Sequence, residues 1–400
     1  MKLSSFLGDF NTAALWAGVT AFVWYAFGAV PLHIGVSQQL GLTLGQSSSW
    51  IFIVWFSGAI SSIVLSIYFR QPIPITWTIP GLIYLGTLAG QFSFAELVGA
   101  NLIAGLVIFG LGLLKIGGRL MKWLPLPIVM GMFAGSILGY VVRLVSATVN
   151  DVLVAGTTVA GYLVGRFIGN PRVPPMGLAV VFGVFGILLG GSATTTTISW
   201  SLPTLAISEI SFSLSAVVAV SLPMVVLAMG LGNVQGLGFL LAQGYRVPVD
   251  RVSTVIGINS VVNALFGGHP ATVARTGVAI LASPDAGPLS GRYWANLIAA
   301  ALTIAMAFAA APVASLLGIL PRSYVFALAG LAILSSIQGA FEKAFGGKLC
   351  FGALVAFAVA ATPFAFVGIT SAFWAIVAGV LASLIAERRD LLAHWRERSQ

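Results

Sequence analysis

The sequence predicts an all-α polytopic membrane protein with 14 transmembrane segments arranged as a 7+7 inverted repeat. Of the 400 residues, 58% are hydrophobic and only 7% are charged, whereas soluble domains carry about 25% charged residues. The chain holds fourteen apolar runs, seven on each side of a polar Ser/Thr-rich stretch at 192–201. The third and tenth runs are broken by the same residue pattern, and paired interruptions of this kind are typical of transporters built from two repeats.

The span boundaries follow from the roughly 20 apolar residues that a helix needs to cross a bilayer. The first repeat (1–191) is expected to hold spans at 12–32, 49–69, 75–90, 94–114, 126–146, 150–167 and 176–191. After a linker at 192–212, the second repeat (213–390) is expected to hold spans at 213–233, 249–266, 271–283, 289–311, 315–337, 348–365 and 367–386, followed by a basic cytoplasmic tail at 391–400. An odd number of spans in each half inserts the second repeat upside down.

The distribution of basic residues predicts that both termini are cytoplasmic. In this orientation the inside segments hold 16 of the 19 basic residues, and only Arg143 and Arg322 lie outside. The net charge of +9 is therefore explained by orientation in a lipid bilayer, and no nucleic-acid partner is expected.

The third and tenth spans are too broken to cross the bilayer as single helices. Both contain Pro-x-Thr-x-x-x-x-Gly before an apolar run, and Pro74, Thr76 and Gly81 each stand 196 residues before a counterpart in 270–277. Extended backbone persists at membrane depth only where protein or a water-filled cavity surrounds it. Each proline is expected to hold its segment extended before a half-helix begins. Two facing half-helices, with their free N–H groups and positive dipole ends, predict an anion-binding site.

Arg275 is the one basic residue left within the membrane, at the start of the tenth span. An arginine near the bilayer centre costs about 2.5–3.5 kcal/mol on insertion scales, so it usually faces a cavity or a partner. It is interpreted either as a cation offered to an anionic substrate or as a structural tie to backbone carbonyls. All ten acidic residues map to loops or span ends, so a cationic substrate would find no counter-charge. The site therefore favours an anion.

Other polar residues within the spans are candidates for contact with the substrate. In the eighth span, Asn233 and Gln235 stand among four glycines and either project into a cavity or bridge helices. His269 either titrates near neutral pH, as a candidate for proton coupling, or caps the broken segment. The complete candidate substrate-binding set is Trp24, Thr76, Trp77, Thr78, Gly81, Asn233, Gln235, His269, Ala271, Thr272, Arg275 and Thr276.

Aromatic and polar residues of the first and ninth spans are also interpreted. Trp24 and Tyr25, deep in the first span, form either an aromatic wall or ordinary packing, and His33 is expected at the membrane interface. Asn259 and Asn263 in the ninth span are interpreted as interhelical hydrogen-bonding groups.

No catalytic motif is present. The sequence has no Gly-x-Ser-x-Gly, no phosphate-binding glycine loop and no Cys/His metal cluster. Its single cysteine, Cys350, excludes an internal disulfide and is expected in the core. Neither enzymatic activity nor a cofactor or metal is predicted.

The residues resemble a known family. The stretch 74–81 resembles the third-span motif of the benzoate:proton symporter (BenE-type) family, 367–379 resembles its last span, and 328–334 is similar to its twelfth. That family is similar in turn to the uracil permease and sulfate permease superfamily, with its UraA-like fold. The resemblance implies a core domain from spans 1–4 and 8–11 and a gate domain from spans 5–7 and 12–14. It also implies that substrate binds between the half-helices of spans three and ten.

The resemblance implies a secondary active transporter in the bacterial inner membrane that imports a small organic anion, with benzoate or a related aromatic carboxylate expected first. Proton symport and elevator-type movement are also implied, and homodimers are common among relatives. Moving one negative charge against 100 mV costs about 2.3 kcal/mol, which a co-transported proton removes. His269 or the substrate's own carboxyl group would carry that proton.

Two alternatives come from residues that depart from the family pattern. Benzoate-type members tend to have an uncharged residue where this chain has Arg275, whereas sulfate-permease-type carriers have an arginine at about that point. An inorganic-anion (sulfate, bicarbonate or chloride) transporter or exchanger is therefore one alternative. A nucleobase permease is another, although Asn233 stands where uracil permeases carry a glutamate.

Overall fold

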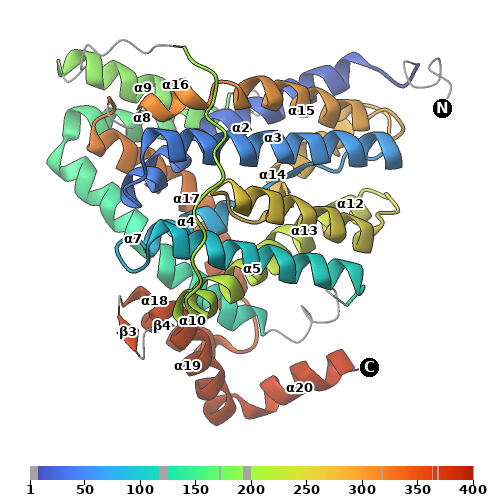
Figure 1. Ribbon diagram of the computed structural model, residues 1–400, viewed down its shortest axis with the longest axis vertical. Helices are drawn as coiled ribbons and strands as arrows, with labels where there is room; N and C mark the ends of the chain where they lie inside the picture. Colours follow the sequence, from blue (N-terminus) through green and yellow to red (C-terminus); the bar gives the residue numbers. More distant parts are fainter. Residues whose placement is uncertain are drawn as a thin grey trace.

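The molecule is almost entirely helical, as Figure 1 shows for the computed structural model. The structure describes residues 8–116, 125–170, 173–191, 200–316, 319–362, 364–366 and 369–399. The elements up to residue 189 are α2 (Thr12–Gln39), α3 (Leu44–Phe69), β1 (Ile75–Trp77), α4 (Ile79–Thr87), α5 (Phe94–Leu113), α7 (Leu126–Asn150), η1 (Val152–Gly156), α8 (Thr157–Ile168) and α9 (Pro175–Leu189).

The rest of the chain begins with a continuous helix that contains π-helical turns. It consists of α10 (Leu214–Ala216), η2 (Val217–Ser221), α11 (Leu222–Val225), η3 (Val226–Asn233) and α12 (Val234–Ala242). After it come α13 (Val249–Leu265), β2 (Ala271–Val273), α14 (Arg275–Leu281), η4 (Pro284–Ala286), α15 (Tyr293–Ala307), α16 (Ala310–Ser315), α17 (Arg322–Phe345), α18 (Cys350–Ala361), β3 (Ala365–Phe366), β4 (Ile369–Thr370), α19 (Ser371–Ala386) and α20 (Arg388–Ser399).

Six helices in the described part of the chain are long and apolar enough to cross a bilayer unaided: Thr12–Gln39, Leu44–Phe69, Phe94–Leu113, Leu126–Asn150, Leu214–Ala242 and Arg322–Phe345. The bent pair of α19 and α20, at 107° to each other, makes a seventh if it is taken as one span. Four further apolar helices have 10–17 residues. The chain is therefore a polytopic membrane protein, and the number of fourteen spans stays a prediction.

Several expected spans have different boundaries in the structure: those expected at 12–32 and 213–233 continue to Gln39 and Ala242, and two others are broken or displaced. The span expected at 289–311 is divided into α15 and α16, and the span expected at 315–337 begins only at Arg322 and continues to Phe345. Pro321 precedes α17 in extended backbone, where its fixed φ and missing N–H suit a helix start. The apolar run alone does not reveal this break.

The part of the expected linker that the structure describes, 200–212, has no regular secondary structure and runs across the bundle (Figure 1). Three of its backbone N–H groups find partners on neighbouring helix ends. Ser208 N donates to Leu265 O at 2.9 Å, Ser211 N donates to Ala95 O at 3.0 Å, and Ala206 N donates to Ser49 Oγ at 3.3 Å. The linker is therefore fixed to the ends of α3, α5 and α13. Residues 192–199 lie outside the described part.

Close helix contacts depend on small residues and amides, as expected for a membrane bundle. A Cβ at Gly257 of α13 would overlap the backbone of Phe109 in α5. The interpretation of the ninth-span amides is confirmed, because Asn259 Nδ2 donates to Ser61 Oγ at 2.8 Å and Asn263 Oδ1 accepts from Ser57 Oγ at 2.6 Å. These bonds join α13 to α3.

Glu387, at the bend between α19 and α20, caps the start of α18. Its carboxylate accepts from Phe351 N at 2.9 Å, Gly352 N at 3.0 Å and Ser383 Oγ at 2.8 Å. Partial burial opposes ionisation, but these hydrogen bonds together hold the pKa of Glu387 below its usual value of 4.5. Cys350, which we expected in the core, is instead half-buried at the first position of α18.

Replacing Glu387 with alanine is expected to lower the stability of the protein by about 1 kcal/mol at neutral pH, the usual value of a helix cap. Because folding lowers this pKa, the stabilisation is present above the ordinary pKa and is lost as the pH falls through the lowered value. Thermal unfolding at neutral pH and at a pH below the lowered pKa measures the effect, which should vanish in acid. Glu342→Ala is the control, because the Glu342 carboxylate accepts only from the exposed Gln338 side chain. An equal loss in both variants would contradict the capping role.

Candidate functional site

The two broken segments pair with each other at the centre of the molecule. Strands β1 and β2 are antiparallel, with Thr76 opposite Thr272 and Trp77 opposite Ala271. The pairing extends beyond the strands, because Thr78 N donates to Pro270 O at 3.1 Å and Ala274 N donates to Pro74 O at 2.9 Å. Each extended segment therefore satisfies the backbone of the other. This pairing explains how irregular backbone persists at membrane depth.

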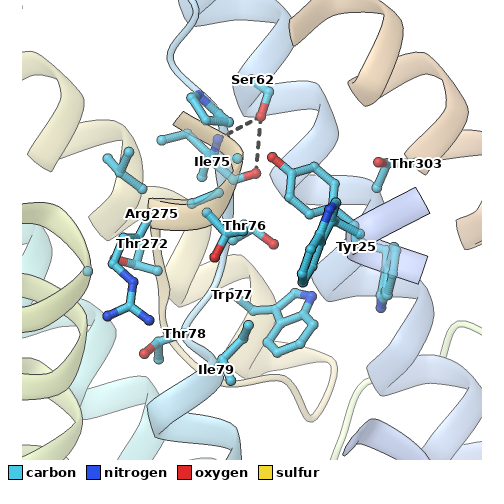
Figure 2. Close-up of a pocket in the computed structure, with 18 of the residues that line it drawn as sticks. Tyr25, Ser62, Ile75, Thr76, Trp77, Thr78, Ile79, Thr272, Arg275 and Thr303 are labelled. Atoms are coloured by element: carbon cyan, nitrogen blue, oxygen red, sulfur yellow. Dashed lines mark hydrogen bonds between the residues drawn. The ribbon is translucent and has the colours of Figure 1, made fainter. Parts of the chain in front are cut away.

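Strand β1 is fixed by α3. Ser62 Oγ accepts from Ile75 N at 2.7 Å and lies 3.0 Å from Ile75 O (Figure 2). Gly58, one turn earlier in α3, lets the strand approach, because a Cβ there would come within 3.0 Å of Ile75 O.

Strand β2 is fixed by Asn233, at the end of η3. Its Oδ1 accepts from Val273 N at 2.9 Å and from Thr272 Oγ1 at 3.0 Å. Gly232 makes room for this contact, since a Cβ there would overlap the Thr272 hydroxyl. Asn233 is only 2% exposed and is not one of the residues lining the cavity described below. Asn233 was expected either to project into a cavity or to bridge neighbouring elements. In the structure it bridges η3 and β2.

A cavity of about 160 Å³ lies beside the paired strands (Figure 2). Four aromatic side chains form part of its wall: Trp24, Tyr25, Trp55 and Trp77. Its polar lining consists of hydroxyl and amide side chains together with one arginine: Ser62, Thr76, Thr78, Thr272, Arg275, Thr276, Asn296, Thr303 and Ser336. The lining thus combines aromatic surface with hydrogen-bonding groups and a single cation.

Arg275 is the only charged residue among the described residues that line the cavity. It is the first residue of α14, its side chain is exposed, and its Nη1 donates to Gln235 Oε1 at 3.0 Å. The salt bridges found in the described residues join Arg70 to Asp9 and Lys348 to Asp390, so no described carboxylate neutralises Arg275. The cavity therefore presents an uncompensated positive charge.

The two half-helices differ at their first turns. Thr78 caps α4 by accepting from Gly81 N at 3.3 Å, and Pro80 has no N–H to offer. No side chain caps α14. The symmetric anion cradle expected from the sequence is therefore reduced on the α4 side, and the polar groups available to an anion gather around Arg275.

The predicted residues divide into two sets. Those that line the cavity are Trp24, Thr76, Trp77, Thr78, Thr272, Arg275 and Thr276. Those that do not line it are Gly81, Asn233, Gln235, His269 and Ala271. Gln235 still contacts the cavity indirectly through its bond to Arg275. At Gly81, a Cβ would overlap the Thr78 methyl group, so this glycine serves packing.

His269 and His33 lie behind Trp77 in a buried aromatic cluster. Both imidazoles are 0% exposed, and the His33 ring centroid lies 4.2 Å from Trp77 and 6.0 Å from His269. His33, which we expected at the membrane interface, is thus enclosed by aromatic rings of α3 and β1. Trp50 Nε1 donates to His269 Nδ1 at 3.1 Å, which occupies that nitrogen's lone pair.

Sequence reasoning missed several lining residues. Asn296, Thr303 and Ser336 are single polar residues in apolar helices, a pattern shared by interhelical hydrogen bonds. Tyr25, considered for an aromatic wall, does line the cavity, and its buried hydroxyl has no hydrogen-bond partner among the described residues. A Cβ at Gly277 would overlap that hydroxyl, so Tyr25 reaches the first turns of α14. The described part of the chain contains no cluster of three His, Cys, Asp or Glu side chains that could hold a metal ion.

The family model described as benzoate membrane transport protein (BenE) matches residues 8–385. The chain belongs to the benzoate membrane transport protein family. The resemblance seen in the sequence is thereby confirmed, and the chain is a membrane transport protein rather than an enzyme.

Two curated relatives cover nearly the same length as this family member. The benzoate membrane transport protein of Acinetobacter baylyi is 26% identical over 379 residues, which is 94% of this chain and 96% of the relative. The inner membrane protein YdcO of Escherichia coli is 28% identical over 356 residues, covering 87% and 90% of the two chains.

Solved structures show the same fold. The transmembrane domain of the cyanobacterial bicarbonate transporter BicA aligns with a TM-score of 0.56 at 19% identity, covering 96% of this chain and 97% of that one. The murine anion transporter Slc26a9 in its inward-facing state aligns with a TM-score of 0.61 at 13% identity, covering 96% and 70%. At these identities the likeness establishes the fold alone.

Proposed function

We propose that this protein imports a small aromatic carboxylate, with benzoate as the first candidate, as a secondary active transporter. The observation that carries the proposal is the cavity whose described lining combines the uncompensated Arg275 with aromatic side chains. A guanidinium binds a carboxylate through charge-assisted, often bidentate hydrogen bonds. Aromatic side chains pack favourably against a phenyl ring. Membership of the benzoate membrane transport family supports the same substrate class.

In the proposed complex, the carboxylate pairs with Arg275 and the hydroxyl of Thr276 at the start of α14. The ring lies against Trp24, Tyr25 and Trp77. This orientation gives a carboxylate both a charged and an apolar contact, whereas sulfate or chloride would leave the aromatic wall unused.

The proposed architecture has fourteen spans in two inverted repeats, 1–191 and 213–390, with both termini cytoplasmic. Spans 1–4 and 8–11 form the core, and spans 5–7 and 12–14 form the gate. Two observations support an elevator-type movement between them. Most of the cavity lining comes from proposed core elements, and Met176 of α9 and Ser336 of α17 complete it from the proposed gate. Substrate thus lies at the boundary between the two domains, and a homodimer remains part of the proposal by family resemblance.

Uptake of radiolabelled benzoate into proteoliposomes tests the proposed function, with protein-free liposomes correcting for passive entry. We expect saturable uptake that an imposed inward proton gradient drives to accumulation. Uptake of labelled sulfate or bicarbonate in the same proteoliposomes, without benzoate flux, would replace the proposal with an inorganic-anion transporter. Competition by uracil alone would indicate a nucleobase permease.

Proton symport is proposed on the energetic ground that it removes the cost of importing a negative charge. We expect the stimulation of uptake by a proton gradient to survive His269→Gln, because His269 is buried away from the cavity and its Nδ1 already accepts from Trp50. The ratio of uptake with and without the gradient is the measurement. A variant that exchanges benzoate normally but no longer responds to the gradient would make His269 the proton carrier. Otherwise the substrate's own carboxyl group remains the candidate.

A further inference from the structure

A second cavity, of about 200 Å³, lies at the opposite end of α4 from the first. Its polar lining comes from α2, α4 and the turn that follows it, α7 and the start of α19: Gln39, Tyr84, Thr87, Gln91, Ser136, Tyr140, Arg143 and Ser371. The first cavity contacts α4 as far as Pro80 and the second contacts it from Tyr84 onward, four residues or about 6 Å further along the helix. The first cavity touches Thr78 before α4, and the second touches Thr87 at its last turn.

Arg143 is the only charged residue in the described lining of this second cavity. Its side chain is exposed, and its guanidinium carbon lies 5.9 Å from the ring centroid of Tyr140 and 5.8 Å from that of Phe326. No described carboxylate forms a salt bridge with it. Aromatic rings therefore hold an unneutralised cation at the cavity, which repeats the combination seen around Arg275.

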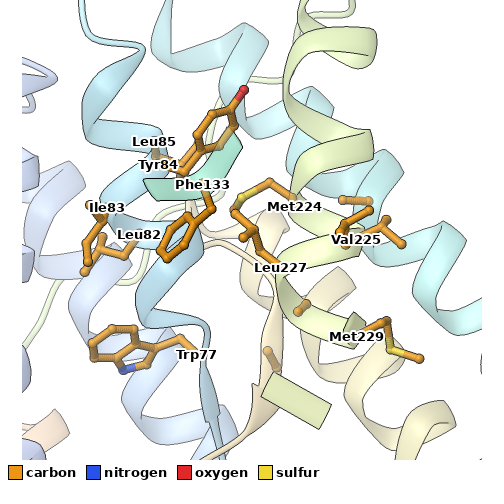
Figure 3. Packing of buried hydrophobic residues seen from close by; sticks show 14 of the residues in the cluster. Trp77, Leu82, Ile83, Tyr84, Leu85, Phe133, Met224, Val225, Leu227 and Met229 are labelled. Atoms are coloured by element: carbon orange, nitrogen blue, oxygen red, sulfur yellow. The ribbon is translucent and has the colours of Figure 1, made fainter. Parts of the chain in front are cut away.

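A buried apolar layer separates the two cavities. Leu82, Ile83 and Tyr84 of α4 are 0% exposed, and Phe133 of α7 lies beside them (Figure 3). Tyr140 closes the layer on the side of the second cavity, because its hydroxyl lies 3.2 Å from Ile83 O and 3.3 Å from Gln39 Oε1. The two cavities thus both lie along α4, but the buried layer between them keeps them unconnected in this conformation.

We propose that the second cavity is an anion-binding vestibule that captures the carboxylate substrate through Arg143 before it reaches the central cavity. This inference rests on the proposed function for its substrate class. In the predicted topology Arg143 is one of only two basic residues on the non-cytoplasmic side, so its charge is not diluted by neighbouring cations there. A cation at a cleft with low-dielectric walls raises the local concentration of anions and their capture rate.

The first test compares uptake kinetics of Arg143→Gln with those of Arg143→Lys and the matched control Arg322→Gln in proteoliposomes. At low ionic strength we expect Arg143→Gln to raise the KM for benzoate about tenfold with Vmax retained. Arg143→Lys should recover most of the affinity, and Arg322→Gln should leave KM unchanged. Added salt should shrink the difference, because it screens an exposed charge. An unchanged KM in Arg143→Gln, or a loss confined to Vmax, would overturn the vestibule.

A second measurement separates failure of the vestibule from failure of the proposed function. In a Cys350→Ser background, Gln91→Cys places a thiol in the second cavity and Ser201→Cys places one on the exposed linker. Benzoate should slow maleimide labelling at position 91 but not at 201, and Arg143→Gln should remove the protection. Protection without any uptake would retain the vestibule and reject benzoate transport. Uptake without protection, with KM unaffected by Arg143→Gln, would reject the vestibule alone.

Discussion

Replacing Arg275 with glutamine is expected to reduce benzoate affinity by about 10- to 100-fold and to bring proteoliposome uptake close to the passive background. A hydrogen bond to a charged group contributes about 1.5–3 kcal/mol, and each 1.4 kcal/mol is a factor of ten in affinity. No other described charge lines the cavity, so the substitution removes the one cation of its lining. Substrate titration and initial uptake rates, measured on protein with wild-type thermal stability, check the result.

Two further variants separate charge from geometry at this position. Arg275→Lys keeps the charge but loses the planar, forked donor arrangement, so we expect intermediate affinity. Gln235→Leu removes the acceptor 3.0 Å from Arg275 Nη1 and should weaken binding less than Arg275→Gln does, because the cation remains. Wild-type affinity in Arg275→Gln would show that the arginine is structural, the other role that the sequence left open.

The sequence predicted the polar elements of this site because membrane physics makes them conspicuous. A proline in an apolar run, a repeated Pro-x-Thr pattern and one arginine within the bilayer all carry a cost that packing or function must offset. The structure brings Thr76, Thr272 and Arg275 to one cavity, as that argument requires. The family membership was predictable for a similar reason, since the third-span motif is an unusual sequence.

The orientation of side chains was less predictable, because the spans are apolar on every face. His33 and His269 face the aromatic rings of α3 and β1, and nothing in the pattern of α2 indicates which face carries His33 inward. The pairing of β1 with β2 was also not predicted. It joins residues 194 to 198 positions apart, so it depends on how the whole bundle assembles.

Replacing Asn233 with alanine is expected to cost about 1–3 kcal/mol of stability and to abolish binding, although Asn233 does not line the cavity. The substitution removes the acceptor for Val273 N, and a buried donor left unsatisfied costs about 1–3 kcal/mol, whereas the Thr272 hydroxyl keeps Ala228 O at 2.9 Å as an acceptor. Arg275 follows two residues after Val273, so a displaced β2 also displaces the cation. Thermal unfolding with and without benzoate measures both effects.

Asn259→Ala is the matched control for this prediction. Asn259 is also a buried amide, but its Nδ2 bonds to the Ser61 hydroxyl, so its loss leaves no orphaned strand N–H. We expect lower stability with the KM for benzoate unchanged. If Asn233→Ala instead weakened binding without lowering stability, Asn233 would contact the substrate directly, and the bridging role would be wrong. If both variants lost stability equally and kept their affinity, the orientation of β2 would not control the position of Arg275. The predicted difference between the two variants arises because only Asn233 bonds to the backbone of the strand that leads to the cation.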